Sequence, residues 1–163
     1  MLMVNLRQTL ILLALLGLPT TVLAQASTRV STATETRCQK VSDNVAKRTA
    51  TYQQNLARHQ SVLDAVHLRL VGVVGRADAR GYDVTKLTAD QANLEQQTSK
   101  IQTDYQALIT SLANVSTTCA APTALAASVA DLHTLSADLA TTRQWITLTL
   151  RDDITQLKNQ VKK

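Results

Sequence analysis

The sequence is poor in aromatic residues, since its 163 positions include no phenylalanine, one tryptophan and three tyrosines. Aromatic side chains bury the largest surfaces in protein cores. A thick globular core is therefore hard to build from the alanine, leucine, valine and threonine that dominate this chain. Narrow apolar seams between long helices suit the composition better.

Residues that break helices are also scarce, because the chain has four glycines and two prolines. The strongest interruption is a turn centred on Tyr82, where Gly81 can take the left-handed conformation that ends a helix and Asp83 can cap the next one. Pro122 is well suited to the first position of a further helix. The sequence therefore predicts three helices, at about residues 37–79, 84–116 and 122–161.

Apolar residues recur in steps of three and four along all three segments, which is typical of coiled-coil seams. With short connections, such helices pack antiparallel. We therefore predict an all-α fold, an elongated three-helix coiled-coil bundle running up, down and up. The third stripe consists of Leu125, Val129, Leu132, Leu135, Leu139, Ile146, Leu150, Ile154, Leu157 and Val161. Its last members are eleven residues apart, which predicts a local change of supercoil.

The only two cysteines, Cys38 and Cys119, lie at the far ends of the predicted helical hairpin. In an oxidising compartment this arrangement favours a disulfide between them, the alternatives being free thiols or an intermolecular bridge. Closing a loop of roughly 80 residues contributes about 4.5 kcal/mol in the chain-entropy model. We predict a disulfide that staples the hairpin.

Two pairing registers of this hairpin, one heptad apart, both keep the stripes face to face. The register set by the disulfide places Tyr52 opposite Tyr105, whereas the register set by the turn places Leu63 opposite Ile101. Periodicity does not choose between them. They are reconciled if residues 116–119 run extended, because each residue then advances about 3.3 Å instead of 1.5 Å.

The N-terminus has the three parts of a signal peptide. Arg7 precedes an uncharged apolar run, residues 10–18, which is followed by Pro19 and by Val22-Leu23-Ala24 before the predicted cleavage site. The run is about half the roughly 20 residues needed to cross a bilayer. We predict a signal peptide over residues 1–24 and export to the periplasm, the cell surface or the medium, with an uncleaved membrane anchor as the alternative.

Two further parts follow the predicted cleavage site. Residues 25–36 are rich in serine and threonine with almost nothing to bury, which predicts a flexible spacer. Residues 37–163 form the predicted helical domain. The net charge of +5 is scattered, apart from a short basic end at Lys158 and Lys162-Lys163. Such a distribution predicts weak contact with anionic envelope polymers and disfavours a nucleic-acid partner.

No combination of residues predicts catalysis or cofactor binding. The three histidines, His59, His67 and His133, include no pair four residues apart, as a helical zinc motif requires. His59 falls in a seam, where a polar residue usually fixes register. Asp152-Asp153 is interpreted as a solvated face. We therefore predict no enzyme, no catalytic residue, no metal, no cofactor and no small-molecule substrate.

Trp145, beside Ile146 in the third stripe, has two interpretations. It is either partly buried packing or an exposed anchor that contacts a partner protein. A heptad stripe serves a second chain as readily as a helix of the same chain. A protein partner or self-association is therefore expected.

The plan of the chain resembles uncharacterised exported coiled-coil proteins of bacteria. The shared features are a signal peptide, a cysteine opening the first helix, the Gly81-Tyr82-Asp83 turn, and a second cysteine before the third helix. Separately, the segment Leu87-Thr88-Ala89-Asp90-Gln91 matches the LTxxQ motif of the Spy and CpxP periplasmic stress proteins, which typically carry two copies. That resemblance implies a small helical chaperone.

Two functions are compatible with these features. The first is an exported, non-enzymatic coiled-coil protein that acts as a spacer, adaptor or assembly subunit at the cell envelope. The second is a periplasmic holdase of the Spy/CpxP or Skp-like type, which cradles unfolded clients on an apolar face near the bent top of the hairpin.

Overall fold

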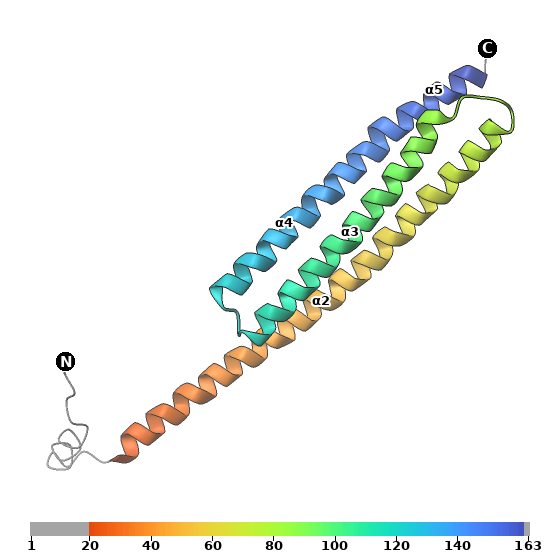
Figure 1. The fold of residues 1–163 in the computed structure, drawn as a ribbon. Coiled ribbons are helices and arrows are strands. Elements are labelled where there is room, and N and C mark those ends of the chain that lie inside the picture. The colour runs from red at the N-terminus through yellow and green to blue at the C-terminus, as the bar shows by residue number, and fades with distance from the viewer. Residues whose placement is uncertain (1–19, 162–163) are drawn as a thin grey trace, which may run out of the picture. The chain divides into compact units, whose positions relative to one another are not determined.

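The computed structural model describes residues 20–161, which are helical except at two turns (Figure 1). The elements are α2 (Thr20–Asp78), α3 (Thr85–Thr117), α4 (Pro122–Trp145), the π-helix η1 (Ile146–Leu150) and α5 (Arg151–Val161). The predicted all-α three-helix fold is confirmed, since α4, η1 and α5 follow one another as a single rod.

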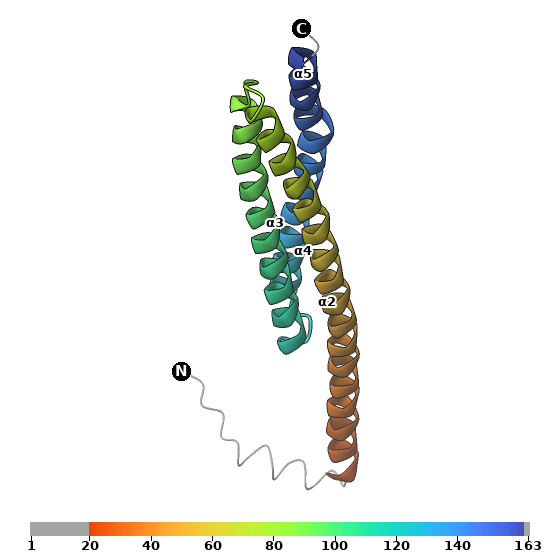
Figure 2. The same ribbon diagram turned by 90° about the vertical axis from the view of Figure 1, so that its right-hand side faces the viewer.

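The chain divides into two compact units, residues 1–39 and residues 40–163. The second unit is the bundle, in which α3 runs antiparallel to its two neighbours, α2 and the α4–η1–α5 rod (Figures 1 and 2). At about 1.5 Å per residue, residues 40–78 of α2 extend for roughly 60 Å. The bundle is thus long and thin, as the lack of large side chains predicts.

The prediction of a flexible spacer over residues 25–36 is wrong, because these residues belong to α2. The segment contains no glycine or proline, and serine and threonine in a helix interior cost only a few tenths of a kcal/mol each. Nothing therefore ends the helix there. The predicted signal peptide falls mainly on residues 1–19, outside the described part. Between residues 20 and 161, no helix has an apolar stretch long enough to cross a membrane.

The core of the bundle consists of two clusters of apolar side chains. The first gathers around α3, whose Leu94, Ile101, Tyr105 and Leu108 are the most deeply buried large side chains. The second consists of Leu70, Ala77, Leu87, Leu150 and Leu157. Val66 and Trp145 pack against both clusters. The core is therefore continuous along the rod, and α3 is its centre.

The turn between α2 and α3 is built as its residue types suggest. Gly81 has a φ of 76°, and the Tyr82 amide donates to the Ala77 carbonyl at 3.1 Å, which closes the helix in a Schellman motif. Val84 is the N-cap residue of α3 and makes no side-chain cap, but Asp83 Oδ1, one position earlier, accepts the amide of the first helical residue, Thr85, at 3.0 Å. This hydrogen bond holds the pKa of Asp83 below its usual value.

The connection between α3 and α4 differs from the expectation of extended chain. The helix continues to Thr117, and Cys119 and Ala120 then adopt left-handed conformations with φ of 55° and 64°. The Ala120 amide donates to the Val115 carbonyl at 2.8 Å, which makes this a second Schellman turn, formed without glycine. Cys38 and Cys119 are both disulfide-bonded and, as the only cysteines in the chain, pair with each other.

Each predicted register of the hairpin is found at a different level. Near its open end, the Ser116 and Ser42 hydroxyls are hydrogen-bonded at 3.2 Å, within one residue of the disulfide register. In the middle, Tyr105 reaches His59, its partner in the turn register. Side chains lean toward the N-terminus of their own helix, so long ones on antiparallel helices lean toward each other and span the offset. The short serines follow the backbone level.

The third helical segment changes its winding at η1, near the place where the eleven-residue spacing predicts a change of supercoil. Its buried positions are Ser128, Leu135, Thr142, Leu150 and Leu157, which are seven residues apart except across η1, where the step is eight. A π turn absorbs one extra residue. The predicted inward positions Leu125 and Val129 are 43% and 50% exposed. The small hydroxyl residues pack inward instead, because they let α4 approach α3 closely.

Two glycines offer a matched test of this description, because an added Cβ meets nothing within 4 Å at either Gly75 or Gly81. Gly81→Ala should lower the free energy of unfolding by about 1 kcal/mol, since only its left-handed φ opposes a side chain. Gly75→Ala, inside α2, should raise it by up to about 1 kcal/mol. Urea unfolding measures both, and the same sign for the two variants would contradict the structure.

Replacing both cysteines by serine should destabilise the bundle by about 4 to 5 kcal/mol, because the unfolded chain regains the freedom of a loop of roughly 80 residues. Thermal unfolding of the oxidised protein, the reduced protein and the double variant measures this. Reduction should reproduce the effect of the double substitution. A loss below about 1 kcal/mol would show that the disulfide hardly constrains the unfolded chain.

Candidate functional site

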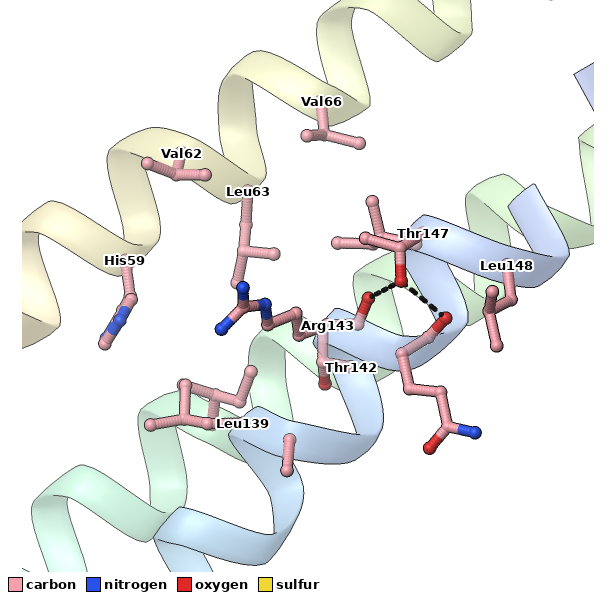
Figure 3. Close-up of a pocket in the computed structure, with 13 residues that line it drawn as sticks. His59, Val62, Leu63, Val66, Leu139, Thr142, Arg143, Thr147 and Leu148 are labelled. Carbon is pink, nitrogen blue, oxygen red and sulfur yellow. Dashed lines mark hydrogen bonds between the residues drawn. The ribbon is translucent and has the colours of Figure 1, made fainter. Parts of the chain in front are cut away.

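A hollow of about 730 Å³ lies between α2 and the junction of α4 with η1 (Figure 3). We call it the α2–α4 groove. Its wall on α2 and its wall on α4 and η1 face each other in the close-up. The lining residues are His59, Val62, Leu63, Val66, Ile101, Leu139, Ala140, Thr142, Arg143, Gln144, Ile146, Thr147 and Leu148. Most of them are apolar.

Two large apolar side chains of the groove remain in water. Val62 of α2 is 53% exposed and Leu148 of η1 is 62% exposed. Leu63 and Ile101, by contrast, are buried in the core beneath. The groove therefore presents apolar surface that no other described part of the chain covers.

Small buried residues lie in the seam between α3 and α4, beside the groove. Ser111 on α3 and Ser128 on α4 are both buried, and each hydroxyl donates to a carbonyl of its own helix, at 3.0 and 2.9 Å. Such small residues allow close approach of α4 to α3. Thr147 in η1, which lines the groove and is exposed, donates to the Arg143 carbonyl at 2.8 Å, as Figure 3 shows.

The polar groups of the groove lie at one end and on one wall. His59 Nδ1 and the Tyr105 hydroxyl are 2.7 Å apart, and burial raises the pKa of Tyr105. Arg143 extends across the groove toward Leu63 (Figure 3). None of the described carboxylates lies within salt-bridge distance of Arg143. It is thus a cation beside an apolar wall without an anion to match.

A second hollow of about 420 Å³ continues along the same side, between α2 and α5. It shares Val66 and Ile146 with the groove. Its charged lining residues are Arg69, Arg151 and Lys158. Neither hollow is lined by an aspartate or a glutamate. Together they form an apolar channel with basic edges.

The carboxylates that form ion pairs across helices lie instead along the two other seams. On the α2–α3 seam, His67 Nε2 is 3.2 Å from the Glu95 carboxylate. On the opposite face of α3, Lys100 pairs with Asp138 of α4 and lies 3.5 Å from Asp104.

A similar group recurs fourteen residues earlier in α3. Lys86 lies 3.3 Å from Asp153 of α5, and Asp90 follows Lys86 by four residues, as Asp104 follows Lys100. The seam between α3 and the α4–η1–α5 rod therefore carries the same lysine and aspartate pair twice.

The surroundings of these aspartates shift their pKa values in opposite directions. Desolvation, reinforced by the neighbouring Asp153 carboxyl, raises the pKa of Asp90. Desolvation and the Asp138 carboxyl likewise raise the pKa of Asp104. Lys100 holds the pKa of Asp138 below its usual value. Each site thus holds two aspartates against one lysine, an arrangement that favours keeping a proton on the α3 carboxyl.

Two predictions about single residues need correction or refinement. Asp153 does not belong to a solvated face, because its side chain is only 12% exposed and pairs with Lys86, whereas Asp152 is exposed. Trp145 is half-buried and packs against both core clusters, which is the packing alternative. Its contact with a partner stays a prediction.

Other sequence features have structural places. The LTxxQ match forms the first turns of α3, with Leu87 in the core and Asp90 beside Lys86 and Asp153. Within residues 20–161, no three histidine, cysteine or acidic residues are grouped so as to hold a metal ion. The groove itself was missed, because Thr142 and Ser128 carry no apolar signal in the sequence.

Comparison with family models, with curated proteins and with solved structures finds no match to this chain. The interpretation of the groove therefore depends on its own geometry.

The raised pKa of Asp90 predicts a pH dependence. Because the folded state holds this proton more tightly than the unfolded state, the free energy of unfolding falls as the pH rises above the ordinary value of 3.8 through the raised pKa. Asp90→Asn removes this loss, so the variant should gain stability over the wild type at pH 7 and little at pH 3.5. Thermal unfolding at both pH values measures the difference.

Asp64→Asn is the matched control for this prediction, since Asp64 is exposed on α2. It should change stability little at either pH. An Asp90→Asn variant that is destabilised at pH 7 would show that the charged carboxylate stabilises the seam.

Proposed function

We propose that this chain is an exported, non-enzymatic helical protein that acts as an adaptor or assembly subunit of the cell envelope, and that it holds a protein partner in the α2–α4 groove. The observation that carries the proposal is the open apolar groove of about 730 Å³. Helical bundles bury their apolar stripes, so uncovered surface of this kind marks an interaction site.

Support for export comes from two features. The N-terminal sequence follows the pattern of a signal peptide, and both cysteines are disulfide-bonded. Disulfides persist in oxidising compartments and are rare in the reducing cytosol. Weak contact with anionic envelope polymers remains a further prediction for the basic residues, and self-association remains one for the apolar stripes.

A holdase is the second candidate, favoured by exposed apolar residues that continue beyond the groove. Leu68 is 72% exposed and Val71 is 44% exposed, both in the half of α2 that leads to the Gly81 turn. A chaperone of this type binds many unfolded clients on such a surface, whereas an adaptor holds one folded partner. The two functions therefore predict different products from the same crosslinking experiment.

The experiment places a photo-crosslinking amino acid at Val62, in the groove, or at Val129, which is equally exposed but outside it. Irradiation of intact cells that make the protein should give one discrete adduct from position 62 and none from position 129. Adding Val62→Asp in a chain that carries the crosslinker at Leu148 should abolish the adduct.

Other outcomes decide against the adaptor. A continuous range of adduct sizes from position 62, together with suppressed aggregation of a model client at equimolar concentration, would support the holdase. No adduct from either groove position, or equal adducts from positions 62 and 129, would contradict a partner in the groove.

A further inference from the structure

Acidic residues lie in two of the seams of the bundle. They are Asp64 and Glu95 at the α2–α3 seam, and Asp104 and Asp138 on the α3–α4 side, where Lys100 pairs with them. In the two hollows on the α2–α4 side, all the Lys, Arg, Asp or Glu side chains in the lining are basic. This side is therefore apolar along its floor and positive along its edges.

The basic residues follow the edges at a regular interval. Arg143, Arg151 and Lys158 are eight and seven residues apart on the α4–η1–α5 rod, and the step of eight spans the π turn. They therefore recur about once per two helical turns, while Arg69 lies on the α2 side. No described carboxylate lies within salt-bridge distance of these four cations.

Resting on the proposed function, we infer that the partner segment in the groove is an acidic amphipathic helix that completes a four-helix bundle. Its apolar stripe would cover Val62 and Leu148, and acidic residues one heptad apart would pair with Arg143, Arg151 and Lys158. Charged residues flanking a heptad seam select partners and orientation in this way.

The size of the channel suits such a helix. Its α2 wall runs from His59 to Val73, which at 1.5 Å per residue is about 21 Å, or four helical turns. A helix of that length has about four inward apolar positions. The combined hollows provide space for their side chains.

Two other occupants fit less well. The first 34 residues of the chain contain no aspartate or glutamate, so this segment cannot supply the missing anions. A second copy carries a net charge of +5 and would bring like charge to the basic edges. Charge complementarity thus points to a different, acidic chain.

The test uses residues 25–163, the chain that remains after the predicted cleavage, and two labelled 21-residue peptides. Both peptides have leucine at the two seam positions of each heptad, and the flanking positions are all glutamate in one and all lysine in the other. Like charges keep each peptide from pairing with itself. Fluorescence anisotropy should show at least tenfold tighter binding of the glutamate peptide, weakening with added salt.

Charge reversal on the protein provides the matched variants. Arg143→Glu combined with Arg151→Glu should weaken binding of the glutamate peptide at least tenfold and strengthen that of the lysine peptide. Arg48→Glu, an exposed α2 position below the groove, should leave both unchanged. Circular dichroism and thermal unfolding check that the variants keep the fold. Val62→Asp should weaken the binding of both peptides.

Equal binding of the two peptides, or tighter binding of the lysine peptide, would overturn the inference. A dimer in light scattering that Val62→Asp abolishes would assign the groove to a second copy. Binding of oleate to the protein, without binding of the glutamate peptide, would assign the groove to an anionic amphiphile. A discrete adduct at position 62 in cells without preference for the glutamate peptide would reject the acidic helix while keeping the adaptor. If the discrete adduct and the preference for the glutamate peptide are both absent, the adaptor is rejected too.

Discussion

Lys100 pairs with Asp138 of α4 and Lys86 with Asp153 of α5, and the two ion pairs lie on opposite sides of the π-helical turn η1. The lysines are fourteen residues apart on α3, whereas their partners are fifteen apart. A regular α-helix would rotate Asp153 away from Lys86. The extra residue absorbed by η1 keeps both pairs in place, and with them the packing of α3 along the α4–η1–α5 rod, which also supplies one wall of the groove.

The seam of α3 with α4 and the groove differ in the side chains they use. Ser111 and Ser128 are small and buried in the seam. The groove instead has Val62 and Leu148, two large apolar side chains that stay exposed. Tyr105 is the largest fully buried side chain, and it connects α3 to His59 where the groove ends.

Much of the fold was predictable because helix breakers are so rare that each one marks a boundary. Gly81 and Pro122 define the turns, and the apolar stripe of α3 gives its core residues. The groove was not predictable, since it depends on Thr142 and Ser128, whose burial arises from backbone proximity and leaves no apolar pattern. The helical state of residues 25–36 was missed for a related reason, because polarity says nothing about helix formation when no residue interrupts it.

The bond between Cys38 and Cys119 also determines how the chain carries mechanical load. Tension applied between the N-terminal segment and the C-terminus passes through the covalent bridge, so residues 39–118 form a closed loop that bears no force. Force then acts only on the residues before Cys38 and after Cys119. Pulling would therefore detach the α4–η1–α5 rod, which forms one wall of the groove, while the hairpin within residues 39–118 stays folded.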